Sequence, residues 1–185
     1  MGTLIVVRHG QASFHEEDYD KLSPLGQDQA RRLGKYWAEH GVTLDRAVSG
    51  PLLRQRHSAE LVREEFEKAG RPFPEIVIDD ALAEMPAERL AKRFMPQLCA
   101  DDAECLALVQ EYMAAQDKKD KERLFQKPFE KMMLKWATKE YHDDEIETFE
   151  YFVNRVKDSF SAITSNNRNG QRVAAFTSGG PTAIA

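Results

Sequence analysis

Three short segments of the chain carry the residue types that bind a phosphate group. They are Arg8-His9-Gly10, Ser49-Gly50-Pro51-Leu52-Leu53-Arg54 and Thr177-Ser178-Gly179-Gly180-Pro181. Two guanidinium groups, an imidazole and a glycine-rich helix start with free amide groups suit a tetrahedral dianion such as phosphate. Arg-His-Gly alone is a weak signal, because a histidine bonded to a backbone carbonyl near the surface is the competing interpretation of His9. The positions of the three segments along the chain decide in favour of a site.

Each of these segments follows a predicted strand. The strand patterns cover Thr3 to Val7, which we expect to be buried, Arg46 to Ser49, Glu75 to Ile78, and Arg172 to Thr177. Helical patterns lie between them, from Ser23-Pro24 to Gly41 and from Gly50-Pro51 to Gly70. Strands that alternate with helices predict an α/β fold with a mostly parallel sheet flanked by helices. In such a sheet ligands bind outside the carboxyl ends of the strands, so the three segments should converge there.

Residues 85 to about 143 break this alternation. The segment is charged and helical in pattern, and we predict a helical cap insertion (85–143) that covers one end of the sheet, within a single domain spanning 1–185. Phe125, Phe129, Met132 and Trp136 recur there at helical spacing, and Pro128 should interrupt their helix. A basic amphipathic helix that binds a membrane or partner is the alternative, but we expect this apolar face to pack on the core.

The ordered set of motifs resembles the histidine phosphatase superfamily, also called the phosphoglycerate-mutase-like family. The resemblance rests on Arg8-His9-Gly10-Gln11, on Leu22-Ser23-Pro24-Leu25-Gly26 with Gln29-Ala30 and Leu33-Gly34, and on the segment Ser49 to Arg54 with Ser58-Ala59-Glu60. It covers the chain outside the insertion and implies a three-layer sandwich. The family continues through a C-terminal helix to a closing strand, so we expect further residues beyond Ala185.

The resemblance also implies a phosphatase that uses no metal and no cofactor. His9 would attack phosphorus to form a phosphohistidine, Arg8 and Arg54 would hold the non-bridging oxygens, and water would then hydrolyse the intermediate. Glu84 would protonate the leaving oxygen, with a solvated loop glutamate as the alternative. The residues that we expect to line the phosphate pocket are Gly10, Gln11, Ser13 and Gly179.

Ser178 departs from the family pattern, because the family carries a second histidine at this position in Ser-His-Gly-Gly. A hydroxyl donates one hydrogen bond but lacks the charge of an imidazolium. Three explanations compete: slower catalysis with serine or an ordered water in the gap, a specialised branch of the family, or a protein that binds phosphate without turnover. Of the other histidines, we expect His40, His57 and His142 at the surface, whereas His15 could fold over the mouth of the site.

Composition limits the class of protein. The chain has 26 Lys and Arg against 31 Asp and Glu, a net charge of −5, which argues against a nucleic-acid partner. The longest apolar run near the start, Leu4 to Val7, is far too short for a signal peptide or a membrane span, so we expect a cytoplasmic protein. Cys99 and Cys105 fit neither a zinc knuckle nor a redox pair.

We therefore expect a phosphatase whose partner is a small phosphorylated substrate or a phosphoprotein. The alternatives are a weak or inactive relative that binds phosphorylated ligands, and a phosphoglycerate mutase, to which Arg89, Lys92 and Arg93 would contribute a carboxylate site. The oligomeric state stays open, a dimer being one option.

Overall fold

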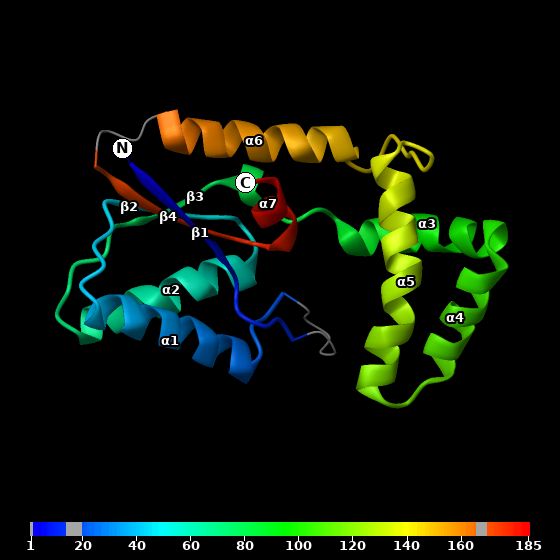
Figure 1. Ribbon diagram of the computed structural model, residues 1–185, viewed down its shortest axis with the longest axis horizontal. Coiled ribbons are helices and arrows are strands. Elements are labelled where there is room, and N and C mark those ends of the chain that lie inside the picture. Colours follow the sequence, from blue (N-terminus) through cyan, green and yellow to red (C-terminus); the bar gives the residue numbers. More distant parts are fainter. Residues whose placement is uncertain (1, 14–19, 166–169) are drawn as a thin grey trace. The chain divides into compact units, whose positions relative to one another are not determined.

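The computed structural model describes residues 2–13, 20–165 and 170–185 (Figure 1). The elements, in chain order, are β1 (Thr3–Arg8), α1 (Pro24–Glu39), β2 (Arg46–Ser49), α2 (Leu53–Lys68), β3 (Ile76–Ile78), the short helix η1 (Asp80–Leu82), α3 (Ala87–Asp101), α4 (Ala103–Ala114), α5 (Lys118–Ala137), α6 (Phe149–Ser165), β4 (Arg172–Thr177) and α7 (Gly179–Ile184). The chain divides into two compact units. The sheet unit comprises Met1–Glu84 and Val153–Ala185, and the helical unit comprises Met85–Phe152.

The four strands form one parallel sheet in the order β1-β4-β2-β3. In the register of this sheet, Arg8 lies opposite Thr177, and Ser49 lies opposite both Phe176 and Ile78. The carboxyl ends of the strands are therefore level. This arrangement confirms the predicted α/β fold, and it brings the three phosphate-type segments to one edge of the sheet.

Helices cover both faces of the sheet, as a three-layer sandwich requires (Figure 1). On one face, Trp37 of α1 and Phe66 of α2 pack against Phe176 of β4 in a common apolar core. The long helix α6 lies on the opposite face. The expectation of a buried first strand was wrong, since Leu4 to Val7 are only half-buried. The reason is that β1 lies at an edge of the sheet formed by the described residues.

The helical unit contains α3, α4 and α5. The prediction that Pro128 interrupts its helix was wrong, because α5 continues from Lys118 to Ala137 through this residue. Packing outweighs the lost backbone hydrogen bond, since Met132 and Trp136 on the same helix are buried. The unit reaches beyond residue 143, because the Trp136 ring packs on Phe149 with ring centroids 5.3 Å apart. None of the described helices combines the length and apolarity needed to cross a membrane.

Candidate active site

His9 directly follows β1, at the carboxyl ends of the strands. Its backbone N–H donates to the carbonyl of Thr177 at 2.9 Å, which continues the pairing of β1 with β4 by one residue. The ring atom Nδ1 lies 2.6 Å from the carbonyl oxygen of Gly10. A carbonyl only accepts, so Nδ1 must carry the proton and Nε2 must carry the lone pair. Nε2 is therefore the ring atom that can act as a nucleophile.

The environment of His9 keeps the imidazole neutral. The pKa of His9 is lowered from 6.5 to about 4, mainly by burial and in smaller part by the positive charges of Arg54 and Arg8. The hydrogen bond to Gly10 and the charge of Asp20 oppose this shift. A neutral imidazole at physiological pH has the protonation state that nucleophilic attack on phosphorus needs.

Arg54 lies in the first turn of α2 and faces His9. Its Nε donates to His9 Nε2 at 3.1 Å, and its side chain is only 7% exposed. Asp20 holds the guanidinium through a 2.7 Å ion pair to Nη1, and its second carboxylate oxygen accepts the backbone N–H of Leu53 at 2.8 Å. Asp20 thus links the arginine to the start of its own helix. The sequence analysis did not predict Asp20 as a site residue. Its position shortly before the helix start at Ser23-Pro24 was the one feature of the sequence that marked it.

Gly10 and Gln11 contact the start of α1. A Cβ atom on Gly10 would lie 2.2 Å from the carbonyl oxygen of Gly26, so only glycine fits there. The N–H of Gly10 donates to Ser58 Oγ at 3.2 Å, and the Ser23 hydroxyl donates to Gln11 Oε1 at 2.9 Å. Ser13 is buried. The role of Gly10, Gln11 and Ser13 in phosphate binding stays a prediction.

Glu84, Arg8 and Gly179 come together at the end of β4. The N–H of Gly180 donates to Glu84 Oε2 at 3.0 Å. A Cβ atom built on Gly179 would lie 3.7 Å from Arg8 Cζ and 3.8 Å from the same Glu84 oxygen. Arg155 of α6 fixes the segment before Glu84 by donating to the carbonyls of Ala81 and Ala83, at 2.7 and 2.9 Å. The Glu84 carboxylate and the Arg8 guanidinium therefore lie beside Gly179 and Gly180. A carboxyl group can supply a proton, and a guanidinium can bind an anion.

Ser178 is completely buried, and its hydroxyl oxygen accepts a hydrogen bond from Gln55 Nε2 at 2.8 Å. Gln55 is also fully buried. Sequence reasoning missed this glutamine, because a polar residue between Arg54 and Arg56 gives no signal of burial. The site thus holds a neutral pair of serine and glutamine.

Among the residues that the structure describes, no histidine other than His9 belongs to this cluster. His40 and His142 are exposed, as expected, and bond to Tyr36 and Asp144 respectively, whereas His57 is half-buried. His15 lies outside the described residues. Across the part of the chain that the structure describes, no group of three or more His, Cys, Asp or Glu side chains could hold a metal ion.

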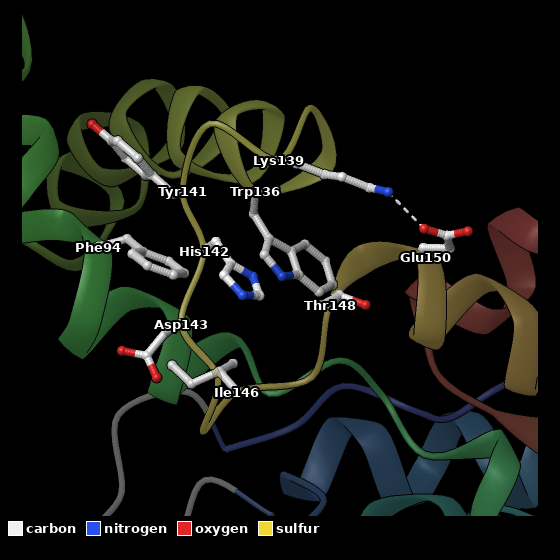
Figure 2. A pocket seen from close by; sticks show the side chains of 9 residues that line it. All are labelled: Phe94, Trp136, Lys139, Tyr141, His142, Asp143, Ile146, Thr148 and Glu150. Carbon is white, nitrogen blue, oxygen red and sulfur yellow. Dashed lines mark hydrogen bonds and ion pairs between the residues drawn. The ribbon is translucent and has the colours of Figure 1, made fainter.

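Each of the two units contains a cavity. One of about 210 Å³ borders Arg8 and His9 on the side of Leu33, Val62 and Phe176, and belongs to the sheet unit. The other, of about 180 Å³, lies within the helical unit (Figure 2). Its rim carries an ion pair of 2.6 Å between Lys139 and Glu150.

Aromatic and charged side chains together line the helical-unit cavity. Phe94 and Trp136 stand on either side of His142 in Figure 2. Asp143, which also lines it, is paired with Arg93 at 2.5 Å. None of the predicted site residues lies there.

Comparisons with known proteins identify the family. The chain belongs to the histidine phosphatase superfamily, branch 1, whose family model matches residues 4–126. A 2,3-bisphosphoglycerate-dependent phosphoglycerate mutase of Rhizobium rhizogenes is 33% identical over 89 residues, which is 45% of this chain and 41% of the relative. The corresponding mutase of Rhizobium meliloti is 32% identical over a segment of the same size. The chain thus matches less than half the length of these curated relatives.

Solved structures share the fold. Bacillus stearothermophilus YhfR superposes with a TM-score of 0.64 at 20% identity, covering 100% of this chain and 77% of that one. A mycobacterial glucosyl-3-phosphoglycerate phosphatase superposes with a TM-score of 0.56 at 17% identity, covering 98% and 76%. A phosphoglycerate mutase of Bacillus anthracis gives a TM-score of 0.59 at 17% identity, covering 98% and 76%. At these identities the likeness establishes the fold alone.

Proposed function

We propose that this protein is a phosphatase that hydrolyses a phosphomonoester, or a phosphorylated protein side chain, through a phosphohistidine on His9. The observation that carries the proposal is the 2.6 Å contact between His9 Nδ1 and the Gly10 carbonyl. It directs the lone pair of Nε2 to the side where Arg54 lies 3.1 Å away. A neutral nucleophile beside a buried cation suits attack on a phosphate dianion, because phosphoryl transfer depends on positioning and charge stabilisation.

In the first step, Nε2 forms a bond to phosphorus while the bond from phosphorus to the leaving oxygen breaks. The Arg54 guanidinium, which donates to Nε2 in the structure, moves its hydrogen bond to a phosphoryl oxygen. Arg8 beside Gly179 stabilises the remaining charge, and Glu84 gives a proton to the leaving oxygen. In the second step, water gives a proton to Glu84 and its oxygen forms a bond to phosphorus, while the bond from phosphorus to Nε2 of His9 breaks. The electron pair returns to Nε2, and inorganic phosphate leaves.

One observation favours a second candidate function, a protein that binds phosphorylated ligands without turnover. The Ser178 hydroxyl is neutral and engaged by Gln55, so the site lacks the positive charge that an imidazolium would add. The residues expected to form the carboxylate site of a mutase are engaged by other groups in the structure. Arg93 and Lys92 are paired with Asp143 and Glu88, and Arg89 donates to the carbonyl of Glu145.

Turnover of p-nitrophenyl phosphate separates the two candidates. We expect the unmodified chain to release p-nitrophenol and the His9→Ala variant to lose this activity. His57→Ala is the matched control, since His57 lies on α2 outside the cluster and should leave the rate unchanged. Full activity in His9→Ala would refute the assigned nucleophile. No turnover in the unmodified chain would refute the phosphatase and leave the binding function.

A further inference from the structure

Arg155 connects helix α6 to the segment that leads into Glu84. Its Nη1 donates to the carbonyl of Ala81 at 2.7 Å and to the carbonyl of Ala83 at 2.9 Å. The residue is half-buried, and a charged donor forms stronger hydrogen bonds than a neutral one. A long cationic side chain from α6 therefore holds two backbone oxygens close to the candidate acid.

The carbonyl of Leu82, between these two, is held by other elements. It accepts from Thr177 Oγ1 at 2.8 Å and from Gln55 Nε2 at 3.0 Å, so β4 and α2 fix this residue. The Leu82 side chain is completely buried. The segment is therefore anchored just before Ala83, and Arg155 acts on the first peptide group beyond this anchor.

The Ala83 carbonyl determines where Glu84 begins. It belongs to the same planar peptide group as the backbone nitrogen of Glu84, so a bond to this oxygen fixes the direction in which the chain enters the glutamate. The Glu84 carboxylate in turn accepts the N–H of Gly180 at 3.0 Å. The proposed proton donor is thus held at both ends, at its backbone through Arg155 and at its carboxylate by the start of α7.

We infer that Arg155 is a positioning residue that sets Glu84 for proton transfer to the leaving oxygen, through the carbonyl of Ala83. This inference rests on the proposed function of the site. In this role Arg155 acts through the backbone and needs no contact with the substrate. A proton donor works only within hydrogen-bond reach of the atom that it protonates, so a small displacement of the carboxyl group slows the transfer. The loss should fall on substrates whose leaving group needs a proton.

The dependence of kcat/KM on the leaving group tests this role, because kcat/KM covers only the steps up to phosphoryl transfer. Phenol, with a pKa of about 10 like that of a tyrosine side chain, needs a proton as it leaves, whereas p-nitrophenol is far more acidic and leaves as the anion. Arg155→Met should lower kcat/KM about 10- to 100-fold for phenyl phosphate, but about threefold or less for p-nitrophenyl phosphate. Arg155→Lys keeps a charged donor and should recover most of the loss.

The Glu84→Gln variant tests whether Arg155 acts through the carboxyl group. It should show the same selective loss for phenyl phosphate, because an amide supplies no proton to the leaving oxygen. The double variant Arg155→Met/Glu84→Gln should match Glu84→Gln within about twofold, since the position of the side chain no longer matters once the acid is gone.

Arg46→Met is the matched control for the attachment of α6. Arg46 begins β2, at the amino end of that strand, and its Nη1 donates to the carbonyl of Ile163 of α6 at 3.4 Å. It therefore bonds the same helix without touching the segment before Glu84, and its loss should leave the ratio of the two kcat/KM values within about twofold. If Arg155→Met fails to fold, Arg155→Gln keeps an amide donor and should lower kcat/KM for phenyl phosphate about tenfold.

Each outcome decides the inference. Equal losses for the two substrates in Arg155→Met or in Glu84→Gln, or no loss at all, would overturn the role of Arg155. A double variant that loses much more than Glu84→Gln, or an equally selective loss in Arg46→Met, would overturn it as well. These results would leave the phosphohistidine on His9 standing, because p-nitrophenyl phosphate alone tests it. No turnover of either substrate by the unmodified chain would refute the phosphatase and the role of Arg155 together.

Discussion

The imidazole of His9 should gain a proton only as the pH falls to about 4. Burial is the largest cause of its lowered pKa, which falls from 6.5 to about 4. At pH 5 about nine in ten molecules should therefore carry a neutral His9, whereas an exposed imidazole would be almost entirely charged. Arg54→Met should raise the pKa only in part, because the charge of Arg54 is a smaller cause than burial.

A proton NMR titration of the histidine ring signals measures this pKa directly. The signal that disappears in His9→Gln is assigned to His9. A midpoint for His9 at or above 6.5 would refute the argument. Such a result would mean that the ring is solvated and that its neutral state does not come from the fold.

The same shift predicts how stability depends on pH. The unfolded chain binds a proton on His9 below pH 6.5, whereas the folded chain does so only below about pH 4. The stabilisation is therefore complete above pH 6.5 and is lost as the pH falls toward 4. Between pH 7 and pH 5 the unmodified chain should lose about 1–2 kcal/mol more than His9→Gln, after allowance for partial solvent screening. Urea unfolding at both pH values measures the difference, and equal losses would contradict the prediction.

Three further predictions concern the groups around His9. Gly26→Ala would place a Cβ atom 2.1 Å from the Gln11 carbonyl oxygen, so it should lower the free energy of unfolding by about 1–3 kcal/mol in urea unfolding; an unchanged value would contradict this close approach. Asp20→Asn removes the charge that holds Arg54 at 2.7 Å and should lower kcat for p-nitrophenyl phosphate about tenfold; an unchanged kcat would show that Arg54 needs no anchor. Ser178→His should overpack the site beside Gln55 and cost about 1–3 kcal/mol of stability without raising kcat, and a faster, equally stable variant would show that the imidazole has room.

The sequence predicted the edge of the sheet at which the site lies. Arg8, Arg54 and Gly179 follow predicted strands, and parallel strands necessarily end at a common edge. The four strands and the helices between them could be located because their apolar patterns are local. The half-buried state of β1 could not be predicted from the sequence, because it depends on the order of the strands in the sheet.

The contacts that hold the site residues in place could not be predicted from the sequence. Asp20 and Gln55 act through partners that are 34 and 123 residues away along the chain. No local pattern predicts a hydrogen bond between two side chains that lie far apart along the chain. The prediction of a helix break at Pro128 was wrong for the opposite reason. The local helix-breaking tendency of proline is outweighed by the packing of α5.

The most direct test of the proposed function is the detection of the phosphoryl group on His9. The unmodified chain is mixed with p-nitrophenyl phosphate, stopped in base within the first turnovers, and digested for peptide mass spectrometry. We predict an acid-labile, base-stable phosphoryl group on the peptide that contains His9, and none in His9→Ala. Turnover without a phosphoryl group on this residue, or with one on a different residue, would contradict the assignment of His9 as the nucleophile.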